Sequence, residues 1–243
     1  MSTADIVAYI GAAAWVPQIL TWLYKAWAKP RVSVSPAPTV DLTYDDSGPV
    51  VTLAFSISVE RHDVIIESME LHMRHEHGDE RTLSWVTAGD LSGQSSAPVT
   101  AIKVATTGLS DLRVIFRDIK SSKELRKRRD EIINQFNFLC TSMPNPLELV
   151  LKSKEAHEAR LQSDQSWYWK PGKYNFDVML RSKAGVHFEE LEIYLSQADS
   201  DFLKQNCELF PEFLSAVVLE ASGQPASFPK WKWLTSGIAR RSR

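Results

Sequence analysis

The chain has 243 residues, of which 44% are hydrophobic and 24% charged, and this excludes a disordered, collagen-like or disulfide-rich class. Its formal net charge of −2 is unevenly spread, with +2 over residues 1–31, +5 over residues 229–243 and −9 over the residues between. An acidic body does not suit general binding to a nucleic-acid backbone, so nucleic acid is not expected as a partner.

The chain begins with an uncharged run of nineteen residues, 6–24. As a helix this run would rise about 28 Å, close to the hydrocarbon thickness of a bilayer, about 30 Å. Basic residues follow it, and the positive-inside rule then puts the rest of the chain in the cytoplasm. Residues 1–30 are therefore predicted to hold a single-pass helix in the cell membrane, with lipid contacts at Trp15, Trp22, Tyr24, Lys25, Trp27 and Lys29.

Other interpretations of this segment stay open: an in-plane anchor, a cleaved signal peptide, or a helix packed in a soluble protein or at an oligomer contact. Pro17 and Gln18 interrupt its middle, which weakens insertion. Small residues recur at four-residue spacing, which lets helices approach closely in lipid. The segment would then also form a homo-oligomer, through Ala4, Ala8, Gly11 and Ala12.

After this segment, Pro30, Pro36 and Pro38 predict a stiff extended linker. Strict alternation of apolar and polar residues over 51–59 then predicts a half-buried strand. A second strand is expected around 69–73, with a bulge near 66–68 where the alternation changes phase. The remaining strands are expected at 82–86, 99–106, 112–116, 147–151, 174–180 and 191–195. Helical insertions are expected at about 119–140, 154–164 and 199–221, the last as two helices, one with Asp199 as its N-cap and one with Pro211 in its first turn.

The segment Pro171-Gly172-Lys173-Tyr174 places a tyrosine just after a turn, at the start of a strand. It resembles the tyrosine corner of immunoglobulin-like sandwiches, over residues 31–117 and 146–196. The resemblance implies a mainly β fold, an immunoglobulin-like antiparallel β-sandwich in residues 31–228. It implies an architecture and no particular function, because many unrelated proteins share it.

Two clusters in the body could carry chemistry. His75, His77 and Asp79 could share a metal ion, although Gly78 marks a hairpin tip, where polar residues collect in any case. The basic run over residues 120–129 could contact phosphate or a lipid headgroup, although its charge spacing favours a solvated helix face. The chain lacks nucleotide-binding glycine patterns, hydrolase elbows and zinc-type cysteine pairs, so neither an enzyme nor a cofactor is expected.

The last segment, residues 229–243, alternates lysine with tryptophan and ends in arginines. Such a pattern suits a membrane surface, where rings sit at headgroup depth and cations meet anionic lipid. A non-enzymatic, membrane-tethered module that binds or senses an unknown protein or small molecule is therefore the leading hypothesis. A membrane-perturbing effector with clustered helices and a soluble interaction protein are the alternatives. The expected lipid contacts of the tail are Lys230, Trp231, Lys232, Trp233, Arg240 and Arg241.

Overall fold

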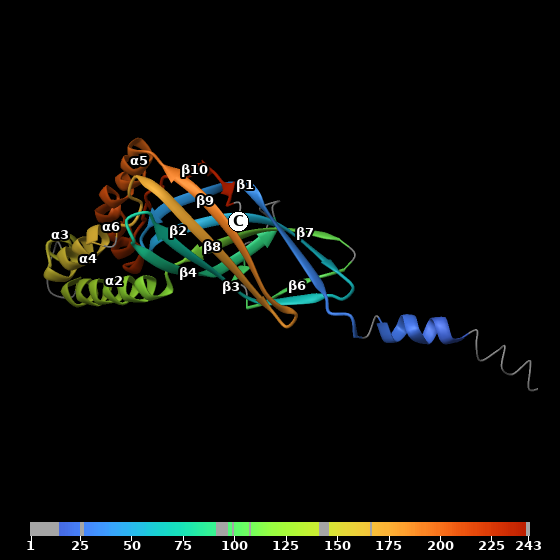
Figure 1. Ribbon diagram of the computed structural model, residues 1–243. Coiled ribbons are helices and arrows are strands. Elements are labelled where there is room, and N and C mark those ends of the chain that lie inside the picture. The colour runs from blue at the N-terminus through green and yellow to red at the C-terminus, as the bar shows by residue number, and fades with distance from the viewer. Residues whose placement is uncertain are drawn as a thin grey trace, which may run out of the picture.

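The computed structural model describes residues 15–24, 27–90, 97–98, 100–106, 108–140, 146–165 and 167–241. The body is mainly antiparallel β, with 44% strand, and its helices gather at one end of the sheet (Figure 1). The strands are β1 (Arg31–Asp45), β2 (Gly48–Glu60), β3 (Val64–His75), β4 (Glu80–Asp90), β5 (Ala97–Pro98), β6 (Ile102–Val104), β7 (Leu109–Arg117), β8 (Gly172–Ser182), β9 (Gly185–Leu195), β10 (Leu234–Gly237) and β11 (Ala239–Arg240). The helices are α2 (Ile119–Cys140), α3 (Pro146–Leu151), α4 (Lys154–Gln165), α5 (Gln197–Glu208) and α6 (Phe210–Ala221), and residues 15–24 are also helical.

The described strands form one sheet in the order β10-β1-β2-β7-β4-β3-β8-β9-β11, with β5 added to β4 and β6 to β3. At one edge β10 pairs with β1, and at the other β11 pairs with β9. Only Ile238 separates β10 from β11, so the C-terminal segment joins the two edges and leaves the sheet nearly closed. The prediction of a mainly antiparallel β fold is confirmed, and the immunoglobulin-like sandwich is not.

The sheet forms where apolar residues alternate, because side chains on a strand point to opposite faces in turn. On β2, Leu53, Phe55 and Ile57 are almost completely buried inside the sheet. The phase change predicted near residues 66–68 is present, since the pairing of β3 with β8 shifts register between Ile66 and Ser68. Burial of such side chains, each worth about 1.5–3 kcal/mol, holds the sheet together.

The predicted linker is wrong. Residues 31–45 form β1, which pairs with β2 and shifts register between Pro36 and Val40. Proline is tolerated here because its missing N–H falls on a strand near the sheet edge and at an irregularity. The outer side of β1 is paired with β10 only from Thr39 onward.

Two expectations about the helices also need correction. Residues 147–151 belong to α3 and not to a strand, because Leu147, Val150 and Leu151 meet the apolar cluster between the helices. The two helices expected within 199–221 are confirmed as α5 and α6, which meet at Leu209. Asp199 is not the N-cap of α5: Ser196 is, and the two residues form a reciprocal capping box. The boundaries expected for 119–140 agree with α2.

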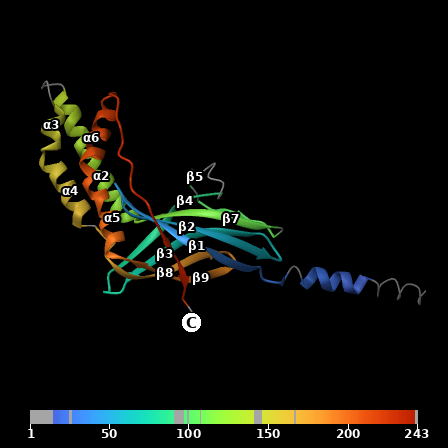
Figure 2. The same cartoon turned by 90° about the horizontal axis from the view of Figure 1, so that it is seen from above.

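The helices build a second, smaller core. Ile132 and Phe136 of α2 face Phe213 and Val217 of α6, with α3 and α4 completing the layer. Seen from above, this layer covers the end of the sheet opposite to the N-terminal helix (Figure 2). The molecule therefore has a helical end, capped by α2–α6, and an open end, where the chain enters β1 and where β8 turns into β9.

Candidate functional site

The N-terminal helix, residues 15–24, projects away from the open end of the sheet (Figure 1). Its only polar side chains are Gln18 and Thr21, which lie three residues apart and therefore on one face. The rest of its surface is apolar and uncovered by the body. The exposed fractions are 64% for Trp15, 49% for Val16, 52% for Ile19, 60% for Leu20, 69% for Trp22 and 64% for Tyr24, and 83% for Trp27 just beyond it.

Arg61 connects the end of the described N-terminal segment to the body. Its guanidinium donates to the Lys29 carbonyl at 3.1 Å and lies 6.0 Å from the centre of the Tyr24 ring. Arg61 also has a positive φ of 81° at the turn after β2, a backbone conformation that non-glycine residues adopt at a cost. One cation therefore steadies the base of the helix while its length stays free of the sheet.

Three more exposed apolar side chains lie at the same end of the sheet. Ile65 at the start of β3, Leu109 at the start of β7 and Val186 beside the β8–β9 turn are 43%, 63% and 46% exposed. The strand registers bring these positions to the open end, since Ser58 pairs with Leu109 and Ile66 with Ser182. Uncovered apolar side chains gathered on the N-terminal helix mark a candidate site of interaction with a membrane or another protein.

The predicted membrane span is not found: within the part of the chain that the structure describes, no helix has the length and apolar character to cross a bilayer. Lys25 and the four small packing candidates lie outside the described residues. Of the remaining predicted lipid contacts, Trp15, Trp22, Tyr24, Trp27 and Lys29 are all exposed.

The C-terminal tail, in contrast to the N-terminal helix, packs against the body. Trp231 is half-buried against Phe213 of α6, with ring centres 5.7 Å apart. The backbone of Lys232 is held by Asn206 of α5, through bonds of 2.8 and 2.9 Å. Trp233 is 46% exposed, and Lys230, Arg240 and Arg241 are exposed. The tail thus belongs to the sheet and the helical layer, and Trp231 lies at the end of the body opposite to the N-terminal helix.

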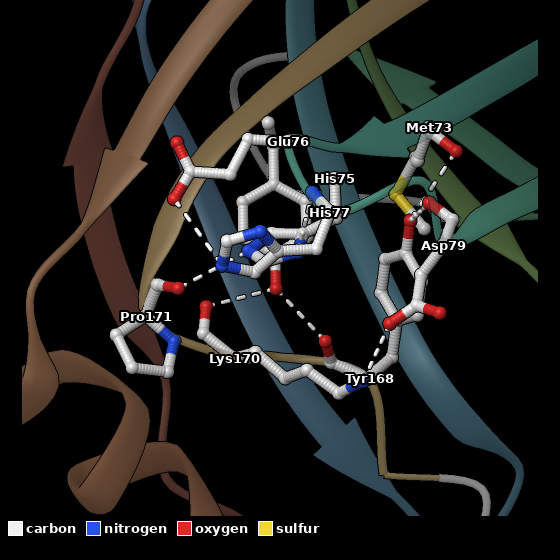
Figure 3. A network of polar contacts seen from close by, with 9 residues as sticks. Met73, His75, Glu76, His77, Asp79, Tyr168, Lys170 and Pro171 are labelled. Atoms are coloured by element: carbon white, nitrogen blue, oxygen red, sulfur yellow. Dashed lines mark hydrogen bonds and ion pairs between the residues drawn. The ribbon is translucent and has the colours of Figure 1, made fainter.

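The proposed metal ligands belong to a network that ties the β3–β4 turn to residues 168–171 (Figure 3). His75 is 1% exposed, and its Nε2 lies 3.1 Å from the Pro171 carbonyl. The backbone N–H of His77 points at the other ring nitrogen of His75, 3.5 Å away. Asp79 binds the Lys170 ammonium, which holds the pKa of that carboxyl below its usual range. Among the described residues, no three His, Cys, Asp or Glu side chains are placed to hold a metal ion.

Tyr174, near the start of β8, accounts for the rest of this network. The Tyr174 hydroxyl reaches the carbonyls of Tyr168 and Lys170, at 2.8 and 2.9 Å. Burial raises the pKa of Tyr168 to about 12 and that of Tyr174 further. Gly172 has a φ of 129°, and a Cβ there would meet His75 Nε2 at 2.8 Å. These phenols stay protonated at neutral pH, so the network acts as a structural clasp.

The sequence singled out the aromatic N-terminal segment, and the structure leaves that segment uncovered. The sequence did not identify the exposed apolar residues at the open end, because Ile65, Leu109 and Val186 come from three strands far apart in the chain. They can be recognised as a group only after strand pairing brings them to the same end of the sheet. No family model, curated protein or solved structure matches this chain, so its function is argued from its own residues.

Proposed function

We propose that this protein is a non-enzymatic binding module that is held on the cell membrane by its N-terminal segment. The observation that carries the proposal is the helix at residues 15–24, whose apolar surface no part of the described body covers. Such a surface costs free energy in water, at about 25 cal/mol per Å². A lipid bilayer removes that cost, and tryptophan and tyrosine suit its interface in particular.

The charges that follow the segment support a position of the body on the cytoplasmic side of the membrane. Lys25, Lys29 and Arg31 follow the aromatic helix directly, and an excess of lysine and arginine marks the cytoplasmic side. The body, with its open end toward the lipid, would then stand in the cytoplasm. Ile65, Leu109 and Val186 at that end could touch the same surface. The helical end would face away from the membrane, available to a ligand or partner.

Alkaline carbonate extraction of cell membranes tests the tether. The full chain should stay in the membrane pellet, because apolar insertion survives high pH whereas peripheral electrostatic binding does not. Release into the supernatant would contradict the proposal. Protease should digest the body in inverted vesicles and spare it in right-side-out vesicles; cleavage from outside would overturn the cytoplasmic placement.

Vesicle flotation locates the contact. Burying about 100 Å² of each ring is worth about 2.5 kcal/mol, so the pair Trp22→Ser and Trp27→Ser should weaken binding at least tenfold. A matched control changes two exposed apolar residues elsewhere, Leu149→Ser and Trp233→Ser. Equal loss in both variants would show that the contact is not confined to the N-terminal segment.

A further inference from the structure

A groove of about 450 Å³ lies between β4, β7 and the first two turns of α2, at the helical end. Its size falls in the range of small-molecule sites, about 300–1,000 Å³. Val86, Ile115 and Ile119 supply apolar walls from all three elements. Polar groups line the rest of it: Thr87, Arg117, Ser122, Lys123 and Arg126.

Two cations at the rim of this groove have no partner in the described part of the chain. Neither Lys123 nor Arg126 makes an ion pair or a hydrogen bond with its side chain there, and both are exposed. Two neighbours in the basic run are occupied, since Arg128 binds Glu158 at 2.8 Å and Lys127 faces Glu131 at 3.9 Å. Helical spacing of three puts Lys123 and Arg126 on the face that borders the groove.

Arg117 adds a third cation whose position is set by the fold. Its guanidinium pairs with Asp45 at 2.7 Å and donates to the Ser47 hydroxyl. Asp45 balances that charge, so the excess positive charge of the groove comes from Lys123 and Arg126. The first amides of α2 are already taken by the Asp118 side chain, which accepts from Lys120 and Ser121, and so play no part in the groove.

Thr87 is a further polar residue in the lining of the groove. Its oxygen is buried and has no hydrogen-bond partner among the described residues, although it belongs to the lining of the groove. An unsatisfied buried hydroxyl costs about 1–3 kcal/mol, and native proteins usually avoid that cost.

We propose that this groove binds a small soluble molecule that carries a phosphate group beside an apolar moiety. Several donors from separate elements suit the three oxygens and the double charge of a phosphate better than a single carboxylate. The isoleucines and Val86 accommodate the apolar part. The groove faces away from the open end, which favours a soluble ligand over a lipid headgroup. This inference names the ligand of the binding module proposed above and rests on that binding role.

Titration of the full chain with phenyl phosphate, followed by ligand-observed NMR without vesicles, tests the proposal. Saturable binding is expected, and the pair Lys123→Gln and Arg126→Gln should weaken it at least tenfold through the loss of two charged contacts. The matched control, Lys120→Gln with Lys127→Gln, removes the same charge from positions of α2 that do not line the groove and should leave affinity within about twofold.

Four results would overturn the inference: no saturable binding, equal loss in the control pair, equal affinity for benzoate, or a vesicle affinity for phosphatidic acid that depends on Lys123 and Arg126. The last would place the site on a lipid headgroup. A negative result for the phosphate site can be distinguished from a negative result for membrane binding by the N-terminal segment. The Lys123→Gln and Arg126→Gln variant should still float with vesicles, and the Trp22→Ser and Trp27→Ser variant should still bind phenyl phosphate.

Discussion

The N-terminal segment and the C-terminal tail share a composition of tryptophan and basic residues but differ in what surrounds them. Trp22 and Trp27 are 69% and 83% exposed on a segment that projects from the open end. Trp231, in contrast, packs on Phe213, and the backbone after it enters strand β10. Similar composition therefore has two roles in one chain. The apolar side chains of the N-terminal segment stay exposed and available to a partner, whereas those of the tail pack against the body and stabilise the fold.

The difference arises from backbone pairing. Residues 234–240 bond to β1 on one side and β9 on the other, so their side chains are carried onto the body. The N-terminal helix satisfies its own backbone internally and needs no such pairing. A helix can consequently leave the body with its side chains uncovered, whereas the tail strands cannot form without the sheet. The following predictions test this contrast.

Of the changes considered, truncation of the two ends should give the largest difference in the free energy of unfolding. Deletion of residues 1–28 should leave the free energy of unfolding within about 1 kcal/mol, because the described contacts of that segment with the body are few and exposed. Truncation after residue 228 removes β10 and β11 and uncovers both sheet edges, so it should unfold or aggregate the protein. Urea denaturation and size-exclusion chromatography measure both. A stable, monomeric truncated chain would contradict the role assigned to the tail.

Asn206→Ala should destabilise the protein by about 3 kcal/mol, because it leaves buried partners unpaired. Asn206 is fully buried and bridges the Thr43 hydroxyl to both backbone groups of Lys232. Chemical denaturation gives the change. Gln205→Ala, on the same helix, is the control and should cost much less. Similar costs for the two would mean that Asn206 does not anchor the tail.

Trp231→Ala should cost about 2 kcal/mol of unfolding free energy through lost packing on Phe213. Trp22→Ala should change it by less than about 0.5 kcal/mol, since its ring is mostly exposed. Thermal or urea unfolding of the two variants side by side provides the comparison. If Trp22→Ala is as costly as Trp231→Ala, the N-terminal helix packs on the body after all.

The smallest effect concerns pH. Burial, and then the charge of Asp45, raises the pKa of Asp46 from 3.8 to about 6, against the lowering effect of Arg117 and Arg129. A carboxyl with a raised folded-state pKa binds protons more tightly when folded, so stability should rise as pH falls from 7 to 5, by about 1 kcal/mol, and level off below about 4.

Asp46→Asn should remove this part of the pH dependence, as measured by urea unfolding at pH 5, 6 and 7. Deletion of residues 1–28 should leave it unchanged, because the described N-terminal residues carry no group that titrates in that range. An Asp46→Asn slope identical to that of the unchanged chain would contradict the assignment to Asp46.

Strand positions were predictable where the local pattern is strict. The alternation over 51–59 and 174–180 anticipated β2 and β8, and the phase change near residue 67 anticipated a real irregularity. β1 was missed because its prolines suggest an extended linker and hide the pairing with β2. The tail strands were missed because four and two residues are too few to display a period.

The candidate sites were predictable to different degrees. The aromatic N-terminal helix is continuous in sequence, so its composition alone indicated an interaction surface. The groove could not be anticipated beyond a basic run, because Thr87, Arg117 and Arg126 come from three elements. Nothing in the run distinguishes Arg126, which borders the groove, from Arg128, which is paired with Glu158.

The sequence by itself determined the secondary structure of most of the body and the apolar character of the N-terminal segment, because both depend on residues close together in the chain. The tertiary structure alone decided that the tail closes the sheet, that His75 and Asp79 belong to the network between the β3–β4 turn and residues 168–171, and that unpaired cations border a groove with apolar and polar walls. These features depend on which distant strands pair and what each side chain then meets. Pairing of that kind is set by burial and backbone hydrogen bonding across the whole molecule.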